Sequence, residues 1–523
     1  MDTCTTFEAI HQERITGKLT AFDRMIFKGH LTGFFGKGRF QLFLSRQGIY
    51  LKHFGRYVEQ ATARVKQHAR RLAEQEGRSF VYLASATTKA SGQSKEDLAR
   101  KIAERDGIEK GLVCVFSVLE PCRSFDVRGN RETHRLEVVR RERKCLHLYF
   151  YVVDPEFGLM HVRLQSWFPF EIQVWINGRE WLARQMDRLG MVYDRYENSF
   201  QSLSNSRKAQ DLSTRLAHRH WPRVLDALAR RVNPLLPLVV RLGFGGYYWV
   251  LDQTEISTDI MFRDRKSLEE ILPSLLRYAS VALSPEDVLR FLGRKLHGSF
   301  KGELTTSLLK RPRGWRIKHR MKRNSIKLYD KGRVLRIETT INNPREFKLL
   351  KRVRVRKRDT WRWLPMGKGV ANLWRYTQVG TQANVRYLEA LAHVQPQGKA
   401  ISELENLCRS RTVDGRRHAK FNPVSAQDSQ LFTATLAGEH LINGFRNRDL
   451  AARLHPRPPV SAADGRRRCA RVCRLIRKLR AHQLVAKVPG SRLYRATPRG
   501  TLVMSAALRY RHLDFPEAYA AAS

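Results

Sequence analysis

Acidic residues are scarce in this chain. Only 49 of its 523 residues are Asp or Glu, against 97 Lys or Arg, which gives a formal net charge of +48. A protein this positive repels itself unless a polyanion neutralises it, and nucleic acid is the commonest polyanion. We therefore expect DNA or RNA as the partner, bound with a steep dependence on salt. The sequence does not distinguish DNA from RNA as the partner, and it is compatible with a homo-oligomer.

Cysteine and long apolar runs are also scarce. Seven cysteines, an odd number, are spread over the chain, which predicts reduced thiols and a cytoplasmic, nucleoid-associated protein. The N-terminus lacks the charged-then-apolar pattern of a signal peptide. The most apolar stretch, 234–251, contains Pro237 and Arg241, so it predicts a buried core segment rather than a membrane span. We expect no membrane partner.

The length predicts about three or four domains, of α/β or mixed α+β class. The apolar run 111–119 predicts a strand buried on both faces, and the charged stretch 56–76 predicts a helix. The expected segments are an N-terminal α/β region over 1–135, a mixed sheet and helical region over 136–300 that can complete the same core, a basic β-rich nucleic-acid-binding segment over 301–362, a helix and linker over 363–427, and a winged helix-turn-helix over 428–515.

The most basic part of the chain is 301–362, with 22 Lys or Arg against 5 Asp or Glu. Within it, 315–340 predicts three short strands, because Asp-Lys-Gly at 330–332 is a hairpin sequence. Alternation then gives the strands one apolar face: Ile317, Ile326, Leu328, Leu335 and Ile337. Phosphate-binding candidates on the other face and around it are Lys318, Arg320, Lys322, Arg323, Lys327, Arg336, Arg354 and Arg356, with Tyr329 and Glu338 among them.

The C-terminal segment predicts helices over 430–442, 448–454 and 461–481, then strands over 484–488 and 493–497. The third helix has an apolar stripe through Val472 and Ile476. This order resembles the winged-helix domains of MarR-type regulators. The resemblance implies that the basic helix enters the major groove while the hairpin reaches phosphate or minor groove. Its nucleic-acid-binding candidates are Arg466, Arg467, Arg471 and Arg474 on the helix and Arg492 on the hairpin.

Four carboxylates form a second candidate site. Asp23 lies between the two strands of a hairpin predicted over 14–31, and Glu120 ends the buried run. Glu255 and Asp259 share a face with Asp252 if 247–262 is helical. Phosphodiester cleavage by two metal ions needs three or four converging carboxylates. The order of these acids along the chain resembles that of the catalytic acids in the ribonuclease H-like core of retroviral integrases and RuvC-type nucleases. The resemblance implies a large insertion after Glu120. We therefore assign Asp23, Glu120, Glu255 and Asp259 as catalytic candidates, with Mg²⁺ or Mn²⁺ held by Asp23, Glu120 and Asp259.

Each acid also has a structural interpretation, because in an arginine-rich chain every carboxylate can find a cation. Relaxase-type chemistry with a tyrosine nucleophile requires two histidines two residues apart, and CLHLYFY offers only His147. The leading hypothesis is a metal-dependent nuclease or transposase, mobile-element encoded and in one version RNA-guided. The alternative is a non-enzymatic winged-helix DNA-binding regulator or an RNA-binding partner protein.

Five blocks spread along the chain are ITGKLTAFDR, EKGLVCVFSVLEPC, KCLHLYFY, HVRLQSWFPF and SIKLYDKGRVLRIETTINN. Together they resemble a family of large basic bacterial proteins that carry a C-terminal winged helix. The resemblance implies a bacterial source. It carries over no established activity and no catalytic residue.

Overall fold

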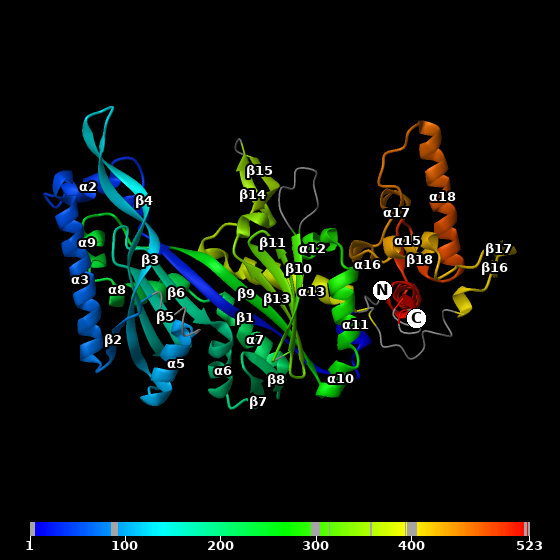
Figure 1. Ribbon diagram of the computed structural model, residues 1–523, viewed down its shortest axis with the longest axis horizontal. Coiled ribbons are helices and arrows are strands. Elements are labelled where there is room, and N and C mark those ends of the chain that lie inside the picture. The colour runs from blue at the N-terminus through cyan, green and yellow to red at the C-terminus, as the bar shows by residue number, and fades with distance from the viewer. Residues whose placement is uncertain are drawn as a thin grey trace. The chain divides into compact units, whose positions relative to one another are not determined.

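The computed structural model describes residues 6–84, 93–293, 304–312, 314–355, 358–392, 394, 405–516 and 520. Helices and strands are both abundant (Figure 1), so the predicted mixed α/β class is confirmed. The chain divides into two compact units, each made of segments that are far apart in sequence. Unit 1 consists of Met1–Lys18, Thr258–Thr339 and Thr381–Ser523, and unit 2 of Leu19–Ser257 and Thr340–Gly380.

The described strands include one large mixed sheet of eleven, in the order β10-β11-β12-β13-β9-β1-β6-β5-β4-β3-β2. Strands β2 and β3 pair in parallel. The pairs β3–β4, β4–β5, β5–β6 and β6–β1 are antiparallel. The unit 2 strands are β1 (Ile15–His30), β2 (Ser79–Tyr82), β3 (Gly111–Asn130), β4 (Arg135–Asp154), β5 (Gly158–Gln165), β6 (Ile172–Asn177), β7 (Tyr193–Tyr196), β8 (Ser199–Leu203) and β9 (Tyr248–Phe262), the first and last of which continue into unit 1.

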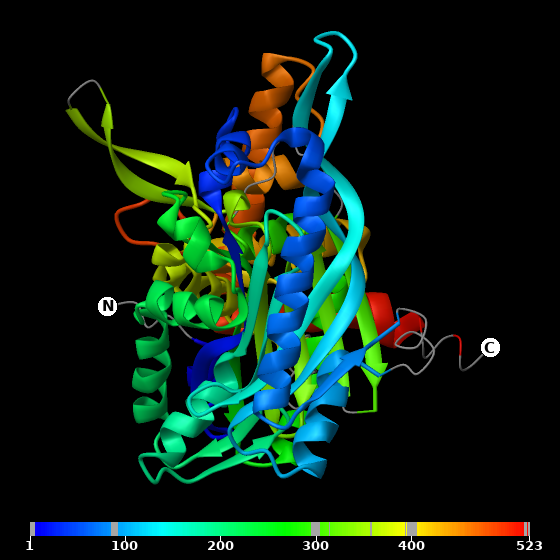
Figure 2. The same cartoon turned by 90° about the vertical axis from the view of Figure 1, so that its left-hand side faces the viewer.

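Helix α3 (Phe54–Gln75) runs alongside β3 and packs Val58, Ala61 and Val65 into the core (Figure 2). The Thr62 hydroxyl on the same helix donates a hydrogen bond to the Ser166 carbonyl at 2.9 Å. This helix confirms the prediction made for 56–76. The other α-helices of unit 2 are α2 (Arg39–Ser45), α5 (Lys95–Arg105), α6 (Gly178–Asp187), α7 (Ser206–Ala217), α8 (Trp221–Val232) and α9 (Leu236–Arg241), and α13 (Leu373–Leu391) begins in unit 2.

Strand β1 runs unbroken from Ile15 to His30 through Asp23, so the hairpin predicted over 14–31 is wrong.

Two further details of the strands correct the sequence analysis. The stretch 247–262 is strand β9, so the helical hypothesis is wrong, and Asp252 falls on the opposite side of the strand from Glu255 and Asp259. Strand β3 does not end at Glu120 but continues to Asn130, paired with β4 throughout. Local propensity misses both features because pairing with neighbouring strands decides them.

A disulfide joins Cys122 on β3 to Cys145 on β4. These residues lie almost opposite each other, since Cys145 pairs in register with Glu120. The expectation of reduced thiols throughout is therefore wrong for this pair. Among the described cysteines, Cys114, Cys408, Cys469 and Cys473 are free thiols.

The sheet strands of unit 1 are β10 (Leu304–Arg311), β11 (Gly314–Met321), β12 (Asn324–Lys331) and β13 (Val334–Ile341), the last of which continues into unit 2. Strands β11, β12 and β13 confirm the three short strands predicted in 315–340. Their apolar face is buried as expected. The α-helices that accompany them are α1 (Phe7–Ile10), α10 (Arg265–Glu269), α11 (Leu272–Arg277) and α12 (Pro285–Phe291).

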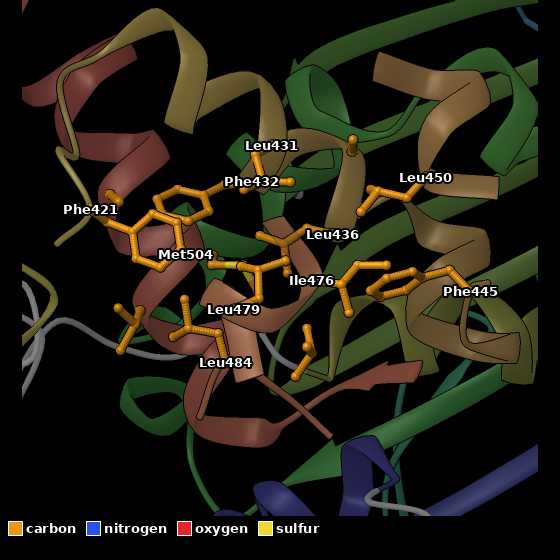
Figure 3. Packing of buried hydrophobic residues seen from close by; sticks show 14 of the residues in the cluster. Phe421, Leu431, Phe432, Leu436, Phe445, Leu450, Ile476, Leu479, Leu484 and Met504 are labelled. Carbon is orange, nitrogen blue, oxygen red and sulfur yellow. The ribbon is translucent and has the colours of Figure 1, made fainter. Parts of the chain in front are cut away.

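The C-terminal part of unit 1 has a core of its own. Phe432, Leu450, Ile476 and Met504, from four different helices, point into this core (Figure 3). Its elements are β16 (Arg411–Val413), β17 (Arg416–His418), α15 (Ala426–Thr435), α16 (Gly438–Asn443), α17 (Asn447–Leu454), α18 (Ala462–Ala481), β18 (Val485–Lys487), β19 (Tyr494–Ala496) and α19 (Pro498–Arg509).

Strands β14 (Lys348–Val355) and β15 (Arg358–Pro365) of unit 2 form a two-stranded sheet separate from the large one. Among the described helices, none is both long and apolar enough to cross a membrane.

Candidate nucleic-acid interface

Helix α18 is built with one apolar and one basic side. The Ser461 hydroxyl caps its first turn by accepting a hydrogen bond from the Asp464 amide at 3.1 Å. Val472, Ile476 and Leu479 recur at helical spacing and are buried in the C-terminal core. The predicted apolar stripe is therefore confirmed, and it fixes which side of α18 faces solvent.

Arg467, Arg471 and Arg474 lie at i, i+4 and i+7 and share the solvent side of α18. All three are exposed, as is Arg466, and no residue in the described part of the chain forms an ion pair or hydrogen bond with any of them. Two neighbours on the helix behave differently, since Arg468 pairs with Asp464 at 2.7 Å and Lys478 with Asp428 at 3.3 Å. One side of α18 thus carries positive charges that no described carboxylate neutralises.

The hairpin β18–β19 follows α18 directly and also presents cations. Lys487 and Arg495 on its strands and Arg492 in its turn are exposed. Gly490, in the same turn, has a φ of +66°, a conformation that glycine adopts without steric cost. Backbone hydrogen bonds of 2.8 Å in both directions between Phe445 and Tyr494 tie the hairpin to the segment that precedes α17.

The basic strands β12 and β13 differ from α18 in accessibility. The Lys327 ammonium donates to Glu338 at 2.5 Å, and both side chains are about nine-tenths buried. The Arg336 guanidinium donates to both oxygens of Asp259, at 2.6 and 3.0 Å, with both side chains almost completely buried. The charges of Lys327 and Arg336 are therefore neutralised inside the protein and do not face phosphate.

The other basic candidates of this segment are more accessible. Arg320 and Arg323 are exposed, and Lys318 and Lys322 are half-buried. Their roles in nucleic-acid binding stay predictions, as does that of the exposed Arg354 on β14. Arg356 lies outside the described residues.

Glu120 lies in a cationic and phenolic environment. Lys95 donates to it at 2.5 Å and the Tyr149 hydroxyl at 2.8 Å, while the Arg163 guanidinium is 3.9 Å away. Burial alone raises the pKa of Glu120, but Lys95 and Arg163 outweigh burial, so the net shift of the pKa is downward. Glu120 is thus an ionised carboxylate whose charge is already balanced by its neighbours.

The other three carboxylates also have partners within the protein. Asp23 accepts a hydrogen bond from the Asn198 amide, and Glu255 lies 3.6 Å from the Arg24 guanidinium. Asp259 is the buried partner of Arg336. Among the described residues, no group of three or more His, Cys, Asp or Glu side chains is arranged to hold a metal ion. These contacts favour structural roles, and the Mg²⁺ or Mn²⁺ assignment stays a prediction.

One further feature of the surface was missed from the sequence. Trp361 and Trp363 on β15 have exposed fractions of 66% and 65%. The spacing of two tryptophans, two residues apart among arginines, could have indicated this feature, because alternation puts them on one side of a strand.

Comparison with family models, with curated proteins and with solved structures finds no match to this chain.

Proposed function

We propose that this chain is a duplex-DNA-binding protein, that its segment 428–515 is a winged helix-turn-helix, and that α18 is the recognition helix. The observation that carries the proposal is the set Arg467, Arg471 and Arg474, exposed on one side of a helix whose other side is anchored in a core. Guanidinium groups in this position can bind phosphate oxygens or the O6 and N7 atoms of guanine.

The arrangement of elements supports this assignment. Helix α17 precedes α18, which has 20 residues and is therefore about 30 Å long. The major groove is about 12 Å wide and admits a helix of this kind. The Phe445–Tyr494 bridge adds a short third strand to the hairpin, which keeps Arg492 and Lys487 close to the helix pair. The hairpin is then the wing, contacting phosphate or the minor groove.

Charge removal on α18 tests the proposal. In full-length Arg467→Gln/Arg471→Gln/Arg474→Gln, affinity for a fluorescent 30-base-pair duplex should fall at least about tenfold at physiological salt. The slope of log K against log salt concentration should fall by about 3, because each lost phosphate contact removes about one unit. Fluorescence anisotropy over a salt series measures both quantities.

The matched control is Arg56→Gln/Arg64→Gln/Arg71→Gln, which removes the same charge from exposed positions of α3. This variant should keep the parent slope to within about one unit. Equal losses in the two triple variants would mean that net charge, and not α18, determines binding. An unchanged slope in the α18 variant would remove α18 from the interface.

A metal-dependent nuclease or transposase with a ribonuclease H-like core is the competing hypothesis, and the contacts of the four carboxylates do not favour it. It is tested by incubating the protein with labelled DNA or RNA and Mg²⁺ or Mn²⁺. Under our proposal Asp23→Asn and Glu120→Gln bind duplex as the parent does, and neither the parent nor the variants cut it. Metal-dependent cleavage by the parent that both variants lose, with binding retained, would establish the nuclease instead.

A further inference from the structure

The hairpin β14–β15 carries aromatic and basic side chains on one face. In its antiparallel register Trp361 pairs with Arg352, and Asp359 pairs with Arg354. Directly paired residues project to the same side of a two-stranded sheet, and so do residues two apart on one strand. Trp361, Trp363, Arg352 and Arg354 therefore share one face of the hairpin.

Both tryptophans of this face are exposed, in contrast to others in unit 2. Trp221 and Trp249 are buried, and Trp175 stacks on the His161 ring with 5.7 Å between centroids. In the described part of the chain, neither Trp361 nor Trp363 stacks on another ring or forms a cation–π pair, and neither indole donates a hydrogen bond. Exposed indoles leave a large apolar surface in water, which indicates a binding surface.

The charge around the two indoles selects the kind of partner. Lys348, Arg352, Arg354 and Arg362 are exposed on the same two strands. Asp359 is the one described acid of these strands, and it pairs with Arg352 at 2.7 Å. A surface that is both cationic and aromatic fits a polyanion with flat rings, because cations track the phosphate backbone while aromatic side chains stack on bases.

The spacing of the two indoles agrees with base stacking. Residues two apart on a strand are separated by about 6.7 Å, at about 3.3 to 3.4 Å per residue. This separation is about twice the 3.4 Å rise between stacked bases. One base therefore fits between the rings, or each ring can carry one base. In a duplex the faces of the bases are already covered by their neighbours, so the fit is to a single strand.

We propose that the hairpin β14–β15 is a separate binding site for single-stranded nucleic acid. Bases stack on Trp361 and Trp363, and Lys348, Arg352 and Arg354 on the same face hold the phosphate backbone. This site belongs to unit 2 and does not depend on the assignment of α18, which belongs to unit 1.

The test uses the full-length protein and a fluorescent 20-nucleotide thymidine strand. Removal of one stacking side chain weakens binding by a factor of about 5 to 150, so Trp361→Ala/Trp363→Ala should bind at least about 25-fold more weakly than the parent. Trp361→Phe/Trp363→Phe retains aromatic rings and should stay within about fivefold of the parent. The matched control is Trp374→Ala, which removes a half-exposed tryptophan of α13 and should leave binding unchanged.

Several results would overturn the proposal. Parent-like affinity of the double alanine variant would exclude the hairpin, and equal weakening by alanine and phenylalanine would exclude stacking. Parent-like binding together with a changed mass in light scattering would instead make the face an interface between copies of this chain. The α18 triple variant should lose duplex affinity but keep single-strand affinity, so the two proposals fail independently.

Discussion

Two regions of unit 1 are rich in basic residues but use them differently. In β12 and β13, Lys327 and Arg336 are buried against Glu338 and Asp259. On α18, Arg467, Arg471 and Arg474 are exposed, and the described residues offer them no carboxylate partner. Basic composition counts both groups equally, whereas only cations without an internal counterion can exchange water for phosphate. The first group should therefore determine stability and the second nucleic-acid binding.

The largest effect expected from this comparison is on stability. Asp259→Ala leaves the buried Arg336 guanidinium without its carboxylate, which should lower the free energy of unfolding by about 3 to 5 kcal/mol. Chemical denaturation followed by circular dichroism measures the change. The control is the double variant Asp259→Leu/Arg336→Met, which removes both charges and should cost less than the single variant. A loss below about 1 kcal/mol in Asp259→Ala would contradict a structural role for the pair.

A smaller effect is expected at Glu171 in unit 2, whose carboxylate lies 2.9 Å from Lys28 and 3.2 Å from the His30 ring. Burial raises the pKa of Glu171, but His30 and Lys28 outweigh burial and lower the pKa from 4.5 to about 2. A lowered carboxyl pKa stabilises the fold above pH 4.5, and this contribution is lost as the pH falls from 4.5 towards 2.

Glu171→Gln should therefore be less stable than the parent by up to about 3 kcal/mol at pH 7, and the difference should close near pH 2. Denaturant titrations at a series of pH values measure it. A difference that persists unchanged across the acid range would show that the carboxylate charge is not what stabilises the parent.

The smallest effect on stability is expected on the hairpin β14–β15. The Arg352 guanidinium lies 2.7 Å from the Asp359 carboxylate, nearly as close as in the buried pairs, but this pair lies at the surface, with side-chain exposures of 66% and 45%. Asp359→Ala should change the free energy of unfolding by less than about 1 kcal/mol, because water already solvates both charges. The same denaturation experiment measures this. A loss of unfolding free energy as large as that of Asp259→Ala would contradict the claim that buried ion pairs stabilise the fold more than exposed ones.

Much of the secondary structure was predictable from local patterns. The strands of 315–340 and the third helix and hairpin of the C-terminal segment follow from hydrophobic periodicity and turn residues. The single helix predicted over 430–442 is wrong, because α15 ends at Thr435 and α16 begins at Gly438. Strand β9 was harder to predict, because the spacing of Asp252, Glu255 and Asp259 fits one face of a helix as well as a strand. The assembly of each unit from segments far apart in sequence depends on long-range contacts, which no local pattern contains.

The candidate site was predictable in residue type but not in accessibility. Arg471 and Arg336 look alike in the sequence. Each is on the polar side of a predicted helix or strand, with another arginine three residues away. Only tertiary packing shows that Arg336 meets Asp259, which is 77 residues away along the chain. Trp361 and Trp363 show the converse, because a tryptophan in a strand is expected to be buried.

The most direct test of the central claim is chemical modification of arginine by phenylglyoxal, read by mass spectrometry with and without duplex DNA. In the absence of DNA, Arg467, Arg471 and Arg474 should react rapidly while Arg336 does not react. Duplex should protect the three α18 arginines at low salt and release them at high salt. Protection elsewhere with α18 still reactive, or rapid modification of Arg336 in the folded protein, would contradict the division between binding and structural cations.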